Sequence, residues 1–132
     1  MKYLLDSDVL ASAIKGRLPV VLRLQALKPG DIGISVLGLA EAETALRLNP
    51  RAQARYGKLL KEFVQSTQVL EIGEAEARQA VTLGVYLQAA GEKLAALDLW
   101  LAATAMARRL VLVTDRISTF ASVPNLEVEK WA

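Results

Sequence analysis

Short runs of hydrophobic residues recur along the chain, and longer amphipathic stretches separate them. Short apolar runs bounded by polar or turn-forming residues are typical of strands. We therefore predict strands at residues 2–5, 32–35, 69–72, 110–113 and 126–129. The stretches between most of these runs carry apolar residues at every third or fourth position, which is the spacing of an amphipathic helix. They predict helices at residues 8–14, 18–27, 36–48, 51–65, 74–91 and 98–108.

Turn and capping residues lie where these segments should end. Gly16 follows the first predicted helix, and Lys28-Pro29-Gly30-Asp31 forms a strong turn signal after the second. Ser35 is placed to cap the helix that begins at Val36, and Asn49-Pro50 ends that helix and begins the next. The boundaries are thus signalled independently of the hydrophobic pattern.

The alternation of strands and helices predicts an α/β fold. Parallel strands need crossover connections, and helices supply them. We expect a short, mainly parallel central sheet with helices on both faces, in three layers, and a ligand site at the carboxyl ends of the strands. The chain has 132 residues, of which 53% are apolar, so it can bury one core, and we expect a single domain over residues 1–132.

The amino-acid composition excludes several kinds of catalytic and metal-binding site. The sequence contains no cysteine and no histidine. This excludes disulfides, thiolate nucleophiles, metal sites built on Cys or His, and catalytic triads that use His. Any reaction must therefore use carboxylates, hydroxyls, Lys or Arg.

Charge and hydropathy give only a weak indication of partners and location. The net charge of +2 slightly favours a polyanionic partner. Asp6 and Asp8 interrupt the apolar N-terminal stretch before it reaches the length of a signal-peptide core. The longest uncharged run, 79–91, is too short to span a bilayer. We expect a soluble cytoplasmic protein.

Two acidic residues directly follow apolar strands. Asp6 follows Leu5, and Asp115 comes soon after the run 110–113. Both should project at the carboxyl edge of a parallel sheet, where α/β folds place their chemistry. The alternative is that each aspartate only caps the next helix or forms a turn.

Two further acids are predicted on helices. Glu43 has Arg47 four residues later and fits an exposed ion pair, whereas Glu41 lies on an apolar stripe with Leu37, Ala45 and Leu48. A charge on such a stripe needs a partner or a cation, unless the side chain reaches solvent from the edge of the stripe.

Asp98 begins a helix that is apolar on nearly all sides. It is either the N-cap of that helix or a second interior acid, and both alternatives place its carboxylate near the protein interior.

These four acids can converge on one crevice. Clustered carboxylates repel each other, and a divalent cation relieves this repulsion. Because only oxygen ligands are present, the expected ion is Mg²⁺, with Mn²⁺ as a substitute. Such a site acts on phosphate esters by stabilising charge during in-line displacement. The members are Asp6, Glu41, Asp98 and Asp115.

Four blocks of the sequence resemble PIN-domain ribonucleases, specifically the VapC-type toxins of prokaryotic toxin–antitoxin pairs. The blocks, in order, are MKYLLDSDVL, ISVLGLAEAE, GEKLAALDLWLAATAMARRLVLVTD and FASVPNLEVEKW. Together they span nearly the whole chain. The family's last acid falls one or two residues after the threonine of its Val-Thr block; here Asp115 holds the first place and Arg116 the second.

The resemblance implies a PIN-like fold and a Mg²⁺-dependent endoribonuclease that cuts tRNA, rRNA or mRNA and is silenced by a cognate antitoxin. It implies that Asp6 and Asp98 hold the metal directly. Glu41 and Asp115 would complete the acidic cluster by direct or water-bridged contacts, and one of them would orient the attacking water. Ser7 and Thr114 would hydrogen-bond carboxylates or metal-bound water. Family members are usually homodimers, with an antitoxin segment in the groove near the acids.

Basic residues are available for RNA phosphates. Arg116, next to Asp115, is the best candidate for an RNA-binding residue, whereas the basic residues of 47–61 fit a solvated helix face equally well.

Two other functions remain open from the sequence. Asp6-Ser7-Asp8 also resembles the nucleophile motif of haloacid-dehalogenase-type phosphatases, in which Asp6 would attack phosphorus and Asp8 would act as acid and base. A non-catalytic PIN-like module that only binds RNA or a partner is the other alternative.

Overall fold

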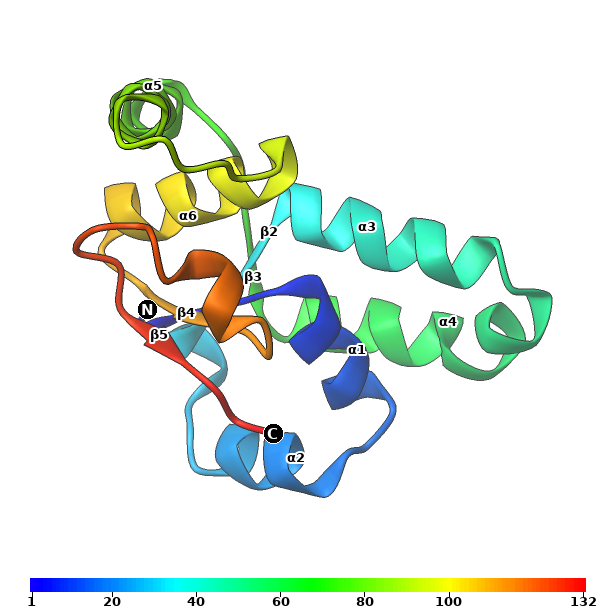
Figure 1. Cartoon of the computed structure of the whole chain (residues 1–132). Coiled ribbons are helices and arrows are strands. Elements are labelled where there is room, and N and C mark those ends of the chain that lie inside the picture. The colour runs from blue at the N-terminus through cyan, green and yellow to red at the C-terminus, as the bar shows by residue number, and fades with distance from the viewer.

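The computed structural model describes residues 1–132 and places a five-stranded sheet at the centre of the fold (Figure 1). All neighbouring strands are parallel, in the order β3-β2-β1-β4-β5. The strands are β1 (Tyr3–Leu5), β2 (Ile32–Ser35), β3 (Gln68–Leu70), β4 (Val111–Val113) and β5 (Val128–Glu129). The predicted α/β fold with a parallel sheet is confirmed. Most strands are a residue or two shorter than their apolar runs, and β3 begins at Gln68 instead of Val69.

Six α-helices connect the strands, close to the predicted segments. They are α1 (Ser7–Ile14), α2 (Leu18–Gln25), α3 (Val36–Arg47), α4 (Pro50–Gln65), α5 (Glu74–Ala89) and α6 (Ala96–Arg108). Ser35 caps α3 through its side chain, as predicted, and the side chain of Asn49 caps α4. Two short 3-10 helices were not predicted, η1 (Pro29–Asp31) and η2 (Ile117–Phe120).

One boundary changes the interpretation of a site residue. Helix α6 begins at Ala96, and its N-cap is Ala95, whose extended backbone starts the helix without a side-chain hydrogen bond. The alternative that Asp98 is the N-cap is therefore wrong. Asp98 lies in the first helical turn, where a negative charge is favoured by the helix dipole and the side chain is free to reach across the sheet edge.

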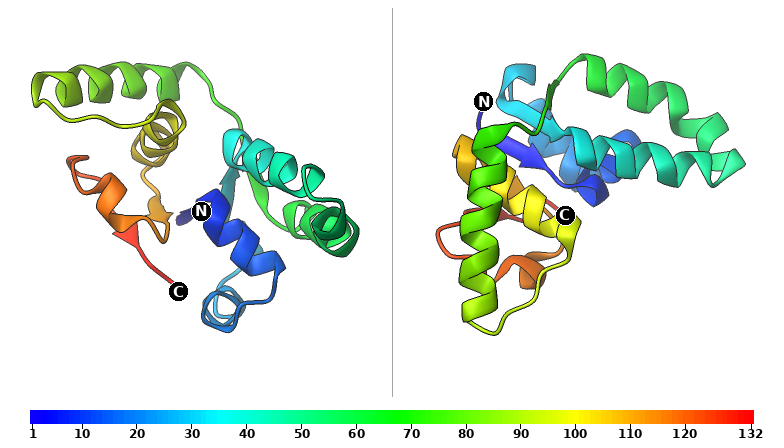
Figure 2. Two further views of the ribbon diagram at one scale, coloured as in Figure 1. Left: turned by 45° about the vertical axis from the view of Figure 1, so that its right-hand side comes forward. Right: turned by 90° about the horizontal axis from the view of Figure 1, so that it is seen from above.

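Successive residues of the central strands point to opposite faces, and each face has its own core. Leu4 and Leu112 pack with α6 and, beyond it, with α5. Leu5 and Val113 pack with α1 and α2 on the other side, and Ile34 contributes to a third core formed with α1, α3 and α4. Figures 1 and 2 show α5 and α6 on one side of the sheet and α1, α2 and α4 on the other.

The strand order creates a switch point between β1 and β4. From β1 the chain proceeds outward through β2 to β3, and then returns to the opposite side of β1 to form β4. Ligands of open α/β sheets bind at the carboxyl ends of the strands at such a reversal. Leu5 pairs with Val113, so Asp6 and Thr114 leave the sheet side by side at this edge.

No helix of the structure combines the length and apolar character needed to cross a lipid bilayer.

Candidate active site

Asp6 lies at the switch point and is held from two sides. Its side chain is only 1% exposed. The backbone amide of Ser7 donates to Oδ1 at 2.7 Å, and the hydroxyl of Thr114 donates to Oδ2 at 2.7 Å. Asp6 is also the N-cap of α1. The capping and the site interpretations of Asp6 are therefore compatible, because one carboxylate has both roles.

The two predicted supporting residues contact this carboxylate in different ways. Thr114 is fully buried and uses its hydroxyl, which also accepts from the amide of Arg116 at 3.0 Å. Ser7 contributes its backbone amide, and its hydroxyl makes no hydrogen bond to Asp6. The orientation of Asp6 thus depends on the Thr114 side chain and the Ser7 main chain.

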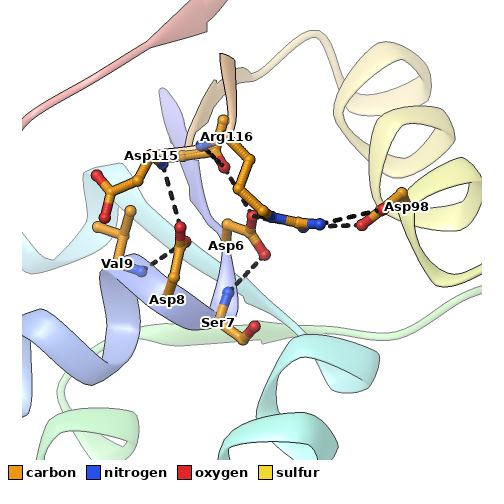
Figure 3. A network of polar contacts seen from close by, with 8 residues as sticks. Asp6, Ser7, Asp8, Val9, Asp98, Asp115 and Arg116 are labelled. Atoms are coloured by element: carbon orange, nitrogen blue, oxygen red, sulfur yellow. Dashed lines mark hydrogen bonds and ion pairs between the residues drawn. The ribbon is translucent and has the colours of Figure 1, made fainter. Parts of the chain in front are cut away.

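Arg116 links Asp6 to Asp98 (Figure 3). Its Nη2 lies 2.9 Å from Asp6 Oδ2 and 2.8 Å from Asp98 Oδ1, and its Nη1 lies 3.1 Å from Asp98 Oδ2. The fork of the guanidinium matches both oxygens of Asp98, a geometry that strengthens an ion pair. The structure therefore brings Asp6 and Asp98 to one point and places a cationic group between them.

Glu41 lies on α3, and its surroundings differ from the prediction. The buried face of α3 consists of Gly38, Ala42 and Leu46, one position away from the expected stripe. Leu48 of that stripe is 80% exposed. The expectation that Glu41 lies on a buried apolar face is wrong, because α1 and α4 pack against the other face of α3. Glu43 is exposed as expected, but it forms no ion pair with Arg47.

Electrostatics nevertheless connect Glu41 to the other acids. Partial burial raises the pKa of Glu41, and the negative charges of Asp6 and Asp98 raise it further, while Arg116 opposes them. A carboxylate whose pKa responds to both aspartates lies within their field. Glu41, Asp6 and Asp98 therefore form one electrostatic group around the Arg116 guanidinium.

Asp115 belongs to a second group, with Asp8. The amide of Asp115 donates to Asp8 Oδ2 at 3.2 Å, and its carboxylate lies on the opposite side of Asp6 from Asp98 (Figure 3). Its Oδ1 is buried and accepts no hydrogen bond. Of the four predicted acids, the structure thus brings Asp6 and Asp98 to one point, with Glu41 in their electrostatic field, and directs Asp115 elsewhere.

The sequence analysis did not assign Asp8 to the metal site. Burial, followed by the charges of Asp6 and Asp115, raises the pKa of Asp8 to about 6, against hydrogen bonds from the amides of Val9 and Asp115. The only sequence feature that could have pointed to Asp8 was its position two residues after Asp6, in the first turn of the helix that Asp6 caps. Its contact with Asp115, 107 residues away along the chain, was not deducible from that position.

The side chains present suit a hard cation. Carboxylate oxygens are the ligands that Mg²⁺ and Mn²⁺ prefer, and Asp6 and Asp98 already bind one cationic group between them. As placed here, no three acidic side chains come close enough together to hold a metal ion. The donor set therefore fits a divalent ion, and Arg116 stands where such an ion would be held.

Comparison with known proteins agrees with this geometry. The PIN domain family matches residues 3–121. No curated protein matches the sequence significantly.

Several solved structures with the same fold are of VapBC proteins or a toxin–antitoxin complex. VapBC2 from Rickettsia felis, bound to a DNA fragment from its promoter, contains a chain that is 25% identical, with a TM-score of 0.89 and full coverage of both chains. DNA-bound VapBC from Salmonella typhimurium matches at 22% identity and a TM-score of 0.90, covering 100% of this chain and 99% of that one. FitAcB from Neisseria gonorrhoeae matches at 22% identity and 0.83, covering 96% and 95%.

The family match covers most of the chain, the fold is shared with these complexes, and the acids lie at the switch point of the sheet. The chain belongs to the PIN domain family, as its resemblance to VapC-type toxins indicated.

Proposed function

We propose that this protein is a VapC-like toxin, a metal-dependent endoribonuclease that hydrolyses RNA phosphodiester bonds. The observation that carries this proposal is the meeting of Asp6 and Asp98 at one point beside the β1–β4 switch point, where both bind the same cationic group. Family membership and the fold shared with VapBC complexes support it.

In this proposal Asp6 and Asp98 hold Mg²⁺ directly, with Mn²⁺ as a substitute. The bound ion would lower the pKa of water and stabilise negative charge on the phosphate under attack. Thr114 keeps Oδ2 of Asp6 in place through a 2.7 Å hydrogen bond, and the Ser7 amide does the same for Oδ1. Such contacts set the geometry of metal ligands in proteins.

Glu41 is the best candidate for a proton acceptor. Its side chain is partly exposed and its pKa is raised, which brings it nearer to neutral pH than an ordinary glutamate. A carboxylate of this kind can accept a proton from attacking water more readily than one whose pKa is low. Asp115 would complete the acidic cluster from the Asp8 side, in a supporting role.

The proposed substrate and partners rest on the resemblance to VapC-type toxins. The proposed substrate is tRNA, rRNA or mRNA, and a cognate antitoxin would neutralise the protein in the cytoplasm, as an expected homodimer. The structural neighbours are complexes with antitoxins, which supports the antitoxin partner.

The direct test is cleavage of end-labelled tRNA and rRNA by purified protein in Mg²⁺ and in EDTA. We expect fragments in Mg²⁺ alone, and none from Asp98→Asn. Loss of cleavage in EDTA would show the metal requirement, and loss in the variant would locate it at Asp98. If folded, metal-bound and inhibitor-free protein cuts none of a broad RNA panel, the catalytic proposal is wrong and a binding module becomes the better interpretation.

Asp8→Asn is a matched control for the phosphatase alternative. Asparagine keeps the size of aspartate and one of the two oxygens that accept from the amides of Val9 and Asp115, so it is the least disruptive substitution at this position. A phosphatase that uses Asp8 as acid and base would lose hydrolysis of p-nitrophenyl phosphate. We expect this variant to keep most RNA cleavage, and neither it nor the wild type to hydrolyse that phosphate ester.

A further inference from the structure

Arg116 takes up the carboxylate oxygens that the proposed metal site needs. Both oxygens of Asp98 accept from its guanidinium and from no other side chain. Asp6 Oδ2 accepts from Arg116 Nη2 at 2.9 Å and Nε at 3.3 Å, besides the Thr114 hydroxyl. A divalent ion shared by Asp6 and Asp98 would have to use the same oxygens. The guanidinium and the ion therefore exclude each other.

The main chain of Arg116 is fixed, whereas its side chain can leave. Its amide donates to Thr114 Oγ1, and its carbonyl accepts from the amide of Thr119 at 3.1 Å, in the first turn of η2. The side chain is 41% exposed, and its guanidinium lies 5.5 Å from the centre of the Phe120 ring. It therefore sits at the mouth of the site, where rotation about its own bonds suffices to bring it into solvent.

Charge explains why an arginine occupies this place. Asp6 is buried with a second acid across from it, and Glu41 lies in the same field. Without a cation these carboxylates would repel one another. Arg116 supplies the only ion pair that either aspartate makes.

We propose that Arg116 is an internal counter-ion that must leave Asp6 and Asp98 before a divalent metal ion binds there, and that its freed guanidinium then binds a phosphate of the RNA. This inference rests on the proposed function, because it takes Asp6 and Asp98 as metal ligands. In this proposal Arg116, the residue expected to bind RNA, is bound to Asp6 and Asp98 until the metal ion replaces it.

Metal affinity tests the first part. We expect Arg116→Gln to bind Mn²⁺ about 10- to 100-fold more tightly than wild type by calorimetry, because charge-assisted hydrogen bonds no longer compete. Arg116→Lys keeps the positive charge but loses the two-pronged guanidinium, so its Mn²⁺ affinity should lie between those of wild type and Arg116→Gln. Arg17→Gln is the control for the loss of one positive charge, since α1 carries the chain about 12 Å from Asp6 before Arg17 is reached. It should bind like wild type.

The wild-type protein provides an independent readout. The Nε–Hε resonance of Arg116, assigned by its loss in Arg116→Lys, should shift during Mg²⁺ titration with the same midpoint as metal binding. If metal binds at a site lost in Asp98→Asn while this resonance stays in place and Arg116→Gln has wild-type affinity, the inference is wrong and the proposed function stands. If neither wild type nor Arg116→Gln binds metal, both are wrong.

RNA affinity tests the second part. With metal present and Glu41→Gln as the common background to keep a tRNA transcript uncut, Arg116→Gln should weaken RNA binding several-fold although it strengthens metal binding. Opposite changes in the two affinities would not result from general destabilisation. RNA binding that is unchanged or tighter in Arg116→Gln would overturn the phosphate contact.

Discussion

Asp6 has three neighbours that each fix a different part of its carboxylate. The Ser7 amide binds one oxygen, and Thr114 and Arg116 share the other. Of these, only the Thr114 hydroxyl is both buried and independent of metal occupancy. Its contribution to the site can therefore be measured separately.

We predict that Thr114→Val weakens Mn²⁺ binding by about 10- to 100-fold, the usual cost of losing a residue that orients a metal ligand. Valine keeps the shape of threonine but cannot donate to Asp6 Oδ2. Calorimetry on the folded variant measures the change. Thr82→Val, at an exposed hydroxyl bonded to the carbonyl of Arg78, is the matched control and should bind metal normally. Equal affinity in both variants would contradict the role of Thr114.

Asp98 and Asp115 should differ in their contributions to catalysis. We expect Asp98→Asn to reduce RNA cleavage by more than the roughly 100-fold upper end for an orienting residue, because it removes a proposed direct ligand of the metal. Asp115→Asn should cost less, since the carboxylate of Asp115 lies away from Asp98, beside Asp8. The Asp115→Asn variant should also be at least as stable as wild type at neutral pH. The substitution removes the charge from Oδ1, a buried oxygen that has no hydrogen-bond partner. Single-turnover cleavage and thermal unfolding measure the two effects.

At the scale of elements, helices α5 and α6 are joined by a half-buried ion pair remote from the site. Glu76, in the first turn of α5, is 5% exposed and accepts from Arg108 of α6 at 2.9 Å. Arg108 also donates to the carbonyl of Glu71, just after β3. Burial alone would raise the pKa of Glu76, but hydrogen bonds from the Gly73 amide and Arg108 outweigh it and hold the pKa below 4.5.

This ion pair predicts a pH-dependent stability difference. A lowered pKa in the folded state stabilises the protein above the ordinary value of 4.5, and the benefit is lost as pH falls through the folded-state pKa. We predict that Glu76→Gln lowers the free energy of unfolding by about 1–3 kcal/mol at pH 7 and that the difference from wild type shrinks below pH 4.5. Urea unfolding across pH checks it. Glu74→Gln, in an exposed ion pair with Arg78, should change stability by less than about 0.5 kcal/mol.

The sequence predicted elements well where local signals agreed. Strand β2 and the starts of α2, α3 and α5 fall at the expected residues. An apolar run marks β2, Pro19 marks the start of α2, and Ser35 marks the start of α3. The start of α6 was missed, since Ala95 caps it by backbone conformation alone. The 3-10 helix η2 was missed as well, because only four residues form it and they carry no helical repeat.

The candidate site shows the same division between local and long-range information. The strand-end positions of Asp6 and Asp115 followed from the apolar runs before them and from the parallel sheet. The direction of Arg116 did not, because it depends on where α6 presents Asp98. The packed face of α3 was misassigned at Glu41 for a related reason. Gly38 lies against the end of β1, and Ala42 and Leu46 pack with α1 and α4, so these long-range contacts decide which face of α3 is buried.

At the scale of the whole molecule, a bound metal ion should stabilise the entire fold. Its proposed ligands come from the end of β1 and from α6, which packs on one sheet face while α1 packs on the other. Mg²⁺ at about 100 times its dissociation constant would add about 2.7 kcal/mol and raise the melting temperature by roughly 10 °C. Scanning calorimetry should show this rise in wild type and not in Asp98→Asn. An equal rise in both would place the ion elsewhere.

The site around Asp6 is completed late in protein synthesis, because β1 at the start of the chain pairs with β4 near its end. Asp6 is held by Thr114, 108 residues later, and by Arg116, 110 residues later, so its site is completed only when β4 docks beside β1. Ribosomes add about 5–20 residues per second, so roughly 5–20 s pass between synthesis of the first acid and of its buried partner. During that interval the nascent chain carries its acids without the geometry to use them. The proposed nuclease site is therefore assembled only after almost the whole chain has been synthesised.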